Sequence, residues 1–107
     1  MTFTEFKRGP ALSIFERMGL QAVLKKSRTW RDLRRVLFDD GDKFIAAVRT
    51  CNRNASSGER VLLHAILYAT GFGWFADKLT MGRAWRRMDE VRGDLRRSVA
   101  ACIAAED

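Results

Sequence analysis

The chain has few of the residues from which catalytic and metal sites are usually built. Its 107 residues include one histidine, His64, and two cysteines, Cys51 and Cys102, which do not form a CxxC pair. One histidine and two separated cysteines do not make up the usual zinc ligand sets. Small secreted scaffolds carry more cysteine than this, so we expect reduced thiols near the core of a cytoplasmic protein. We predict no metal and no cofactor.

Proline, strand patterns and long apolar runs are scarce as well. Pro10 is the single proline, and β-branched residues never alternate over five or more positions. Both facts favour an all-α chain. The longest apolar run, 61–69, contains His64 and is less than half of the about 20 residues that span a membrane. Residues 1–10 are polar, without the apolar segment of a signal peptide, so we expect no membrane association.

Most of the sequence shows the periodicity of α-helices. The predicted helices begin at Pro10, with an interruption at Gly19 before residue 26, and continue over 28–38, 43–52, 59–70, a short turn at 74–79 and 81–105. The expected N-caps are Ser27, Asp42, Ser56 or Ser57, and Thr80. Residues 52–58 are predicted to form a loop. The length fits a single domain over 1–107, a compact bundle of five to six helices.

Two of these helices define the expected architecture. Residues 59–70 are apolar on nearly every side, which predicts a buried helix that the others cover. The long amphipathic C-terminal helix carries a heptad-like stripe of Met81, Trp85, Met88, Val91, Leu95, Val99 and Cys102. This stripe packs either on the buried helix or against a second copy of the chain in a homodimer, and the pattern fits both.

The excess of basic residues is the one chemical bias in the sequence that indicates a binding partner. The net charge is +7, and the 20 basic residues comprise fifteen arginines and five lysines. A first cluster holds Lys25, Lys26, Arg28, Arg31, Arg34 and Arg35, and a second holds Arg83, Arg86, Arg87, Arg92, Arg96 and Arg97. The planar guanidinium fork suits phosphate or carboxylate. This composition favours a polyanionic partner.

The two clusters differ in how far they neutralise themselves. Asp32 is the one carboxylate within the first cluster, whereas Asp89, Glu90 and Asp94 accompany the second, where pairs such as Arg86–Glu90 are expected. We therefore predict that DNA or RNA is bound mainly through the first cluster, and that Arg83, Arg86 and Arg87 extend this surface. Contact with the phosphate backbone does not require the precise placement of side chains that recognition of bases requires.

A helix–turn–helix is a more specific interpretation of the first cluster. The turn would lie at residues 25–27, and the helix 28–38 would enter the major groove. In that case Arg28, Thr29, Arg31 and Asp32 face bases, and Lys25, Lys26 and Arg35 contact phosphates. The usual glycine of the turn is missing.

Other features favour structural roles over chemistry. His64 and Tyr68 are one helical turn apart, but no recognisable nucleophile, base and orienting residue accompany them, so we predict that the protein is not an enzyme. The acidic residues Asp39, Asp40 and Asp42 fit a turn with a helix cap better than a cation loop. The aromatic residues Trp30, Phe72, Trp74 and Phe75 fit core positions better than a base-stacking platform.

The second half of the chain contains a recognisable order of residues: Arg60, Leu62, Leu63, Leu67, Tyr68, the corner 71–75, Leu79, Met88, Asp89 and Asp94. In this order it resembles short helical proteins of unknown function from bacterial plasmids and prophages. The resemblance implies a mobile-element setting and carries no functional residues. It adds an alternative function: a phage or plasmid protein that binds and inhibits a host protein complex that binds nucleic acid, as an anti-CRISPR inhibitor does.

Overall fold

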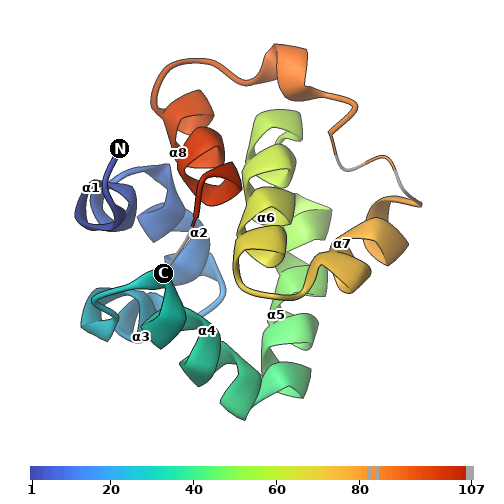
Figure 1. The fold of residues 1–107 in the computed structure, drawn as a ribbon. Coiled ribbons are helices and arrows are strands. Elements are labelled where there is room, and N and C mark those ends of the chain that lie inside the picture. Colours follow the sequence, from blue (N-terminus) through green and yellow to red (C-terminus); the bar gives the residue numbers. More distant parts are fainter. Residues whose placement is uncertain (82, 84, 106–107) are drawn as a thin grey trace.

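The chain folds into short helices joined by tight turns. A computed structural model describes residues 1–81, 83 and 85–105. Within these residues all regular secondary structure is helical, which confirms the all-α prediction. The helices are α1 (Phe3–Arg8), α2 (Pro10–Arg17), α3 (Gln21–Lys26), α4 (Trp30–Asp39), α5 (Gly41–Asn54), α6 (Ser57–Ala69), α7 (Gly73–Thr80) and α8 (Gly93–Ile103), with a 3-10 turn η1 (Met88–Glu90) (Figure 1).

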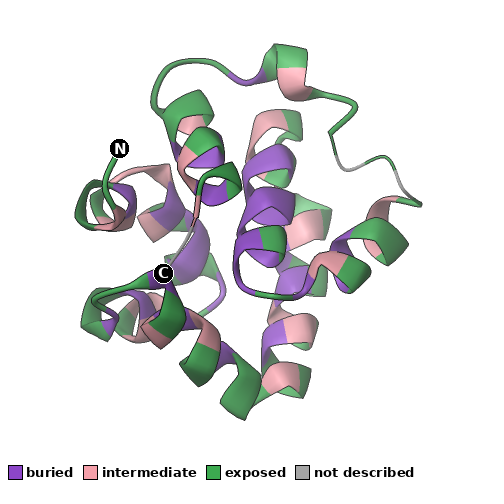
Figure 2. Cartoon of the chain, in the orientation of Figure 1, coloured by how far each residue is buried: buried purple, intermediate pink, exposed green. Residues whose placement is uncertain are grey.

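Helix α6 is in contact with most other elements, among them α2, α5, α7, α8 and η1. Its residues 61–67 are all buried, and Figure 2 shows this buried stretch in the middle of the molecule. A capping box starts the helix: the Ser56 hydroxyl accepts from the Glu59 amide at 3.2 Å, and the Glu59 carboxylate accepts from the Ser56 amide at 2.9 Å. Local capping and an apolar surface thus place this helix inside the fold.

The prediction of one helix over 81–105 is wrong. Helix α7 ends at Thr80, its C-cap Met81 has a left-handed φ of +56°, and α8 begins only at Gly93, with a φ of +60°. A right-handed helix does not continue through such residues, and residues 85–87 of the interval form a turn that leads into η1. Positions 82 and 84 of the predicted helix lie outside the described residues.

The heptad-like stripe is therefore not a single helical face. Val91, Val99 and Cys102 are buried in the core, while Met81 is 82% exposed. The C-terminal half of the stripe packs inside the protein through the contact of α8 with α6. The alternative in which this stripe pairs two copies of the chain requires a continuous helix, and the helix is broken between Thr80 and Gly93.

The N-terminal helix α1 is missing from the sequence-based prediction. Thr2 and Glu5 form a capping box that starts it, with hydrogen bonds of 3.0 and 3.1 Å. Phe3 and Phe6 pack on Trp30 of α4, with ring centroids 4.9 and 4.7 Å apart. This contact with a residue far along the chain explains why a short N-terminal segment is helical.

Several boundaries shift because other residues cap the helices. Ser27 ends α3 instead of starting the next helix, and Thr29 caps α4. Asp40, not Asp42, caps α5 and nearly joins it to α4. The predicted loop 52–58 shrinks because α5 runs to Asn54 and α6 starts at Ser57.

The predicted corner between α6 and α7 is present. Gly71 has a φ of +89°, and a side chain there would come within 2.8 Å of the Phe38 ring. Phe72 and Phe75 are buried, whereas Trp74 is 59% exposed. In the part of the chain that the structure describes, every helix is too short or too polar to cross a membrane.

Candidate nucleic-acid interface

The first basic cluster lies on a helical hairpin formed by α3, the turn 27–29 and α4. Helix α4 begins where the Thr29 hydroxyl accepts from the Asp32 amide at 3.1 Å and the Asp32 carboxylate accepts from the Arg28 amide at 3.1 Å. Its inner side buries Trp30, Leu33 and Leu37 in the core. With one side of α4 fixed inward, the basic residues of its other side face solvent.

Five of the six residues of the first cluster are exposed: Lys25, Lys26, Arg28, Arg31 and Arg35. Arg34 is the exception. Its side chain is half-buried, and Nε donates to the Ala69 carbonyl at the end of α6, at 2.7 Å. The interaction satisfies a carbonyl that the helix leaves without an intrahelical partner. Arg34 is thus an internal anchor and is not part of the exposed surface that the sequence predicted.

Asp32 brings one negative charge to this surface and lies beside Arg35. Its Oδ1 lies 3.5 Å from Nη2 of Arg35, and both side chains are in contact with solvent. Such exposed ion pairs contribute little to the stability of the fold. Because Asp32 and Thr29 both hold the start of α4, the helix–turn–helix interpretation keeps only Arg28 and Arg31 as base-facing side chains. The turn also lies at 27–29 and not at 25–27.

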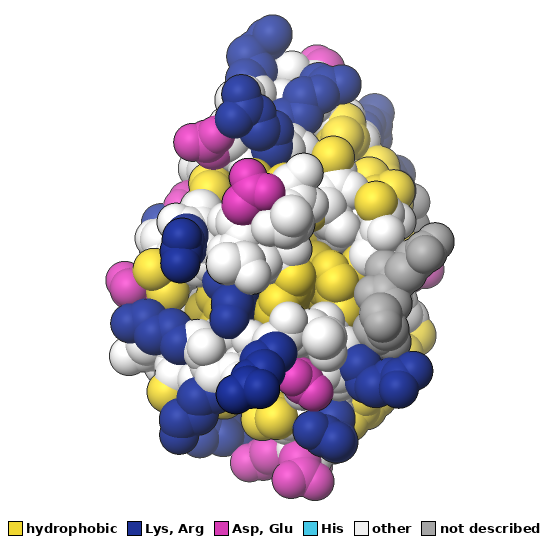
Figure 3. All heavy atoms as spheres, turned by 60° about the vertical axis from the view of Figure 1, so that its left-hand side comes forward, with side chains coloured by type: hydrophobic (Ala, Val, Ile, Leu, Met, Phe, Trp, Pro, Cys, Tyr) yellow, Lys and Arg dark blue, Asp and Glu magenta, His cyan; other side chains and the backbone are white. Residues whose placement is uncertain are grey.

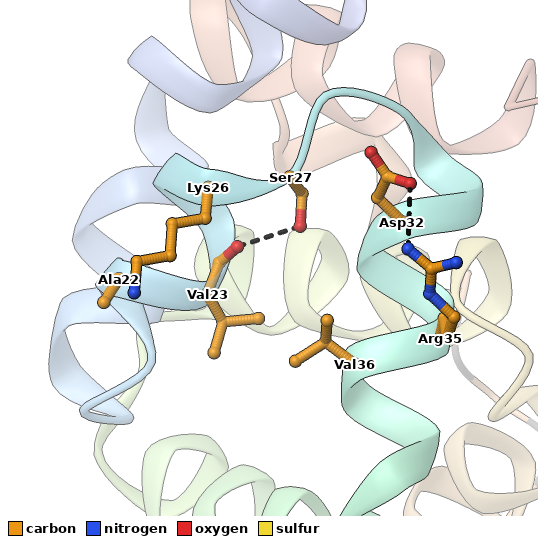
Figure 4. A pocket seen from close by; sticks show the side chains of 7 residues that line it. All are labelled: Ala22, Val23, Lys26, Ser27, Asp32, Arg35 and Val36. Atoms are coloured by element: carbon orange, nitrogen blue, oxygen red, sulfur yellow. Dashed lines mark hydrogen bonds and ion pairs between the residues drawn. The ribbon is translucent and has the colours of Figure 1, made fainter.

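A pocket of about 330 Å³ opens between α3 and α4 (Figure 4). Its apolar surface comes from Ala22, Val23 and Val36. In Figure 4 Lys26 lies on the α3 side, and Asp32 and Arg35 lie on the α4 side. The Ser27 hydroxyl donates to the Val23 carbonyl at 2.8 Å and so holds the end of α3 beside the pocket. Cations from two helices therefore border one concave surface.

Helix α1 adds two basic residues that the sequence analysis missed. Lys7 Nζ donates to the Ser27 carbonyl at 2.6 Å and to the Lys25 carbonyl at 3.3 Å. A hollow of about 220 Å³ lies here, lined by Thr4, Lys7, Arg8, Leu12 and Lys25. Lys7 is separated from this part of the chain by 18 to 20 residues, so no local spacing signals the contact. Only the tertiary structure extends the surface over α1.

The extended surface has a basic end and an acidic end. A third hollow of about 260 Å³ shares Val23 and Val36 with the pocket, but Asp39, Asp40 and Lys43 line its far side. Among the described residues no group of three or more potential ligands is arranged to hold a metal ion. Figure 3, viewed from the side of α1 and α3, shows basic side chains around a patch of hydrophobic atoms. The electrostatic attraction of an anion to this surface is therefore strongest toward α1 and weakest at the acidic end.

Part of the second cluster lies away from the first. Arg83, Arg86 and Arg87 are exposed on the segment between α7 and η1, which rises on the right-hand side of Figure 1, whereas α3 and α4 lie at the lower left. Arg87 pairs with Glu90 at 2.6 Å. Arg97 and Asp94 lie 3.4 Å apart. The expected partner of Glu90 was Arg86, and the structure pairs it with Arg87.

The residues considered for catalysis lie apart. His64 is buried and lines a hollow next to Thr80, whereas Tyr68 lines a different groove near Trp85. The Tyr68 hydroxyl donates to Asp77, and this hydrogen bond, burial and the carboxylate charge raise the pKa of Tyr68. A phenol held protonated in this way is a poor base.

Both thiols are free and buried, as the sequence predicts. Burial is the main cause that raises the pKa of Cys51 and of Cys102. Thiols whose ionisation is suppressed are unreactive toward electrophiles and oxidants. The aromatic residues Trp30, Phe72 and Phe75 are buried and therefore unavailable for base stacking.

The chain matches no known protein family, no curated protein and no solved structure. The resemblance to plasmid and prophage proteins therefore stays a prediction. The functional conclusion has to come from the geometry and the charge of the surfaces described above.

Proposed function

We propose that the protein binds nucleic acid, without catalysis, through a surface that we call the α1–α4 basic surface. Its members share exposure and a positive charge: Arg8, Lys25, Lys26, Arg28, Arg31 and Arg35. Lys7, bound to the carbonyls of residues 25 and 27, holds α1 beside them. One observation carries the proposal. Cations from three helices line two hollows on either side of the consecutive residues Lys25 and Lys26. Asp32, which also accepts from the Arg28 amide, is the one carboxylate in the lining of these two hollows that the structure describes.

The chemistry of this surface favours the phosphate backbone over base edges. Lys25 and Lys26 present ammonium groups at the end of α3, which act on phosphate as point charges. Binding of this kind depends on counterion release and weakens steeply with salt. We therefore propose binding with little sequence preference to DNA or RNA.

The rest of the fold acts as a support in this proposal. The protein is a bundle of helices around α6, and the basic surface stands on the hairpin that α4 anchors through Arg34 and Ala69. A charged surface held by packed helices keeps its side chains close together in the free protein. We propose that the protein does this work in the cytoplasm.

The test is a charge reversal with a matched control. Lys26→Glu removes a cation from the last turn of α3, and Lys78→Glu makes the same change in the last turn of α7, away from the proposed surface. Labelled single-stranded and duplex DNA and RNA are titrated at 50 and 200 mM salt. We expect Lys26→Glu to weaken binding about tenfold at low salt and to reduce the salt slope by about one, while Lys78→Glu stays within about twofold of wild type.

Binding that is absent at 50 mM salt, or that does not change with salt, contradicts the proposal. So does an equal loss in the two variants, because binding would then depend on net charge alone. Circular dichroism of each variant shows that its helix content is retained.

A second candidate is inhibition of a host complex that binds nucleic acid. The supporting observation is a set of exposed apolar side chains that are not members of the basic surface: Phe38 at 55%, Trp74 at 59% and Ile103 at 63% exposure. A groove of about 480 Å³ with Tyr68, Trp85 and Ile103 in its lining lies among them. If this function is correct, a complex with the target survives nuclease treatment and is lost in Trp74→Ala. Loss of the complex on nuclease treatment contradicts it.

A further inference from the structure

A small pocket lies at the N-terminal end of α6, away from the α1–α4 basic surface. Its volume is about 140 Å³. It is lined by Ser57, Arg60, Val61, His64, Thr80, Arg83 and Arg87. Positions 57, 60, 61 and 64 follow the helical spacing i, i+3, i+4, i+7, so α6 supplies one wall with a single face. The end of α7 and the segment after it supply the other wall.

The lining is strongly positive. Three guanidinium groups, those of Arg60, Arg83 and Arg87, border the pocket, and no carboxylate is among the lining residues that the structure describes. Glu59, the nearest acid along α6, is held elsewhere by Arg17 and by the Ser56 amide. Glu90 pairs with Arg87 from the solvent side, where both side chains are well exposed. A concave surface with one sign of charge concentrates anions.

One of the three guanidinium groups is positioned in advance. Arg60 Nε donates to the Asn52 carbonyl at 2.9 Å and Nη2 donates to the Arg53 carbonyl at 3.4 Å, both at the end of α5. Arginine has five N–H groups, so further donors of Arg60 remain for a ligand. A donor that is already fixed loses little conformational freedom on binding.

The turn after α7 brings the second wall into place. Met81 takes up the left-handed conformation, and the Arg83 amide donates to the Thr80 carbonyl at 3.2 Å. The Met81 side chain is 82% exposed, so side-chain packing does not explain why a residue other than glycine adopts this conformation. Beyond this turn, Arg83 and Arg87 line the pocket opposite α6.

We propose that this pocket binds the phosphate group of a small phosphorylated ligand. Guanidinium forks match the oxygens of a tetrahedral dianion, and a cluster of three favours two negative charges over one. The buried imidazole of His64 and the hydroxyl-bearing Ser57 add polar lining. The inference goes beyond nucleic-acid binding, because it assigns Arg83 and Arg87 to a separate site that also uses Arg60.

The experiment is a calorimetric titration of the full chain with inorganic phosphate at constant ionic strength. Arg83→Gln removes a lining guanidinium, and Arg86→Gln removes the same charge from the same exposed segment without touching the pocket. We expect saturable 1:1 binding with a Kd on the order of millimolar, weakened about tenfold in Arg83→Gln and within about twofold of wild type in Arg86→Gln. Acetate at the same concentration should bind at least about tenfold more weakly.

A parallel titration with adenosine 5′-monophosphate separates the sources of the phosphate group. Tighter binding than that of inorganic phosphate indicates a nucleotide, and equal binding indicates that the phosphate group alone is recognised; either supports the site. The absence of saturable phosphate binding, or equal weakening in Arg83→Gln and Arg86→Gln, overturns it. Lys26→Glu leaves this pocket intact, so failure here is distinguishable from failure of the nucleic-acid proposal.

Discussion

The two arginine-rich regions look alike in sequence and differ in structure. In the first, α3 and α4 bury Leu24, Leu33 and Leu37 and spread their charges outward over a broad surface. In the second, residues 85–90 form a turn and η1, and the exposed residues Arg83 and Arg87 line a pocket on α6. A similar density of charge thus gives a surface suited to a long polyanion in one place and a pocket suited to a small anion in the other. The difference arises from how the backbone is held, not from the number of arginines.

The largest expected effect tests how deeply each region is anchored. Trp30 is 7% exposed and packs on Phe3 and Phe6, whereas Met81 is 82% exposed. We expect Trp30→Ala to lower the free energy of unfolding by about 3–5 kcal/mol. Met81→Ala should change it by about 0.5 kcal/mol or less.

Urea denaturation followed by circular dichroism measures both values. Trp30→Phe serves as the milder variant if Trp30→Ala does not fold. Similar values for the Trp30 and Met81 variants would show that the two regions are anchored alike and would remove the basis of the comparison.

A smaller effect separates two neighbouring arginines of α4. Arg34 donates to the Ala69 carbonyl, and Arg35 is exposed beside the pocket. We expect Arg34→Gln to lower the free energy of unfolding by about 1–2 kcal/mol with little change in affinity for DNA at 50 mM salt. Arg35→Gln should weaken DNA binding about threefold to tenfold and leave stability within about 0.5 kcal/mol. If instead Arg34→Gln weakens DNA binding and Arg35→Gln does not, the exposed surface is not the binding surface.

The smallest effect concerns the ion pair between Arg17 and Glu59 at the start of α6. The hydrogen bond from Arg17, together with the Ser56 amide, lowers the pKa of Glu59 below its ordinary value. A carboxyl group with a lowered folded-state pKa stabilises the fold above its unfolded pKa of about 4.3, and this contribution is lost as the pH falls through the folded value. The pair is partly exposed, so we expect at most about 1 kcal/mol.

Glu59→Gln should therefore be less stable than wild type at pH 7 and approach it at pH 3. Urea denaturation at the two pH values measures the difference, and Glu16→Gln, an exposed glutamate of α2, is the control. A difference between Glu59→Gln and wild type that does not shrink in acid contradicts the role given to the Arg17 pair.

Features that depend on neighbouring residues can be predicted from the sequence, and features that depend on distant ones cannot. The Ser56 cap and the Gly71 corner follow from local rules, and both are present. Helix α1 was missed because Trp30 stabilises it from 24 or more residues away. The helix 81–105 was overpredicted because a regular apolar spacing does not reveal that Met81 is exposed while Val91 is buried.

For the candidate surface too, contacts between residues far apart in the chain cannot be predicted from the sequence. The cluster from Lys25 to Arg35 is visible in the sequence, but periodicity does not reveal that Arg34 turns to Ala69, 35 residues away. Lys7 is equally invisible, because its partners are carbonyl oxygens of residues 25 and 27. Backbone acceptors have no signature in the amino-acid sequence, so anchoring arginines and lysines look like exposed ones.

The position of Lys7 has a consequence for how the first helix responds to ligand. Lys7 ties α1 to the end of α3, and Phe3 and Phe6 tie it to α4. A polyanion that contacts both Arg8 and Lys25 would bind the docked arrangement of α1 more tightly than an undocked one. By thermodynamic reciprocity, whatever loosens α1 weakens binding, and binding protects α1 from local unfolding. The first eight residues would then act as a coupled part of the interface, whose amide hydrogens exchange more slowly when the partner is bound.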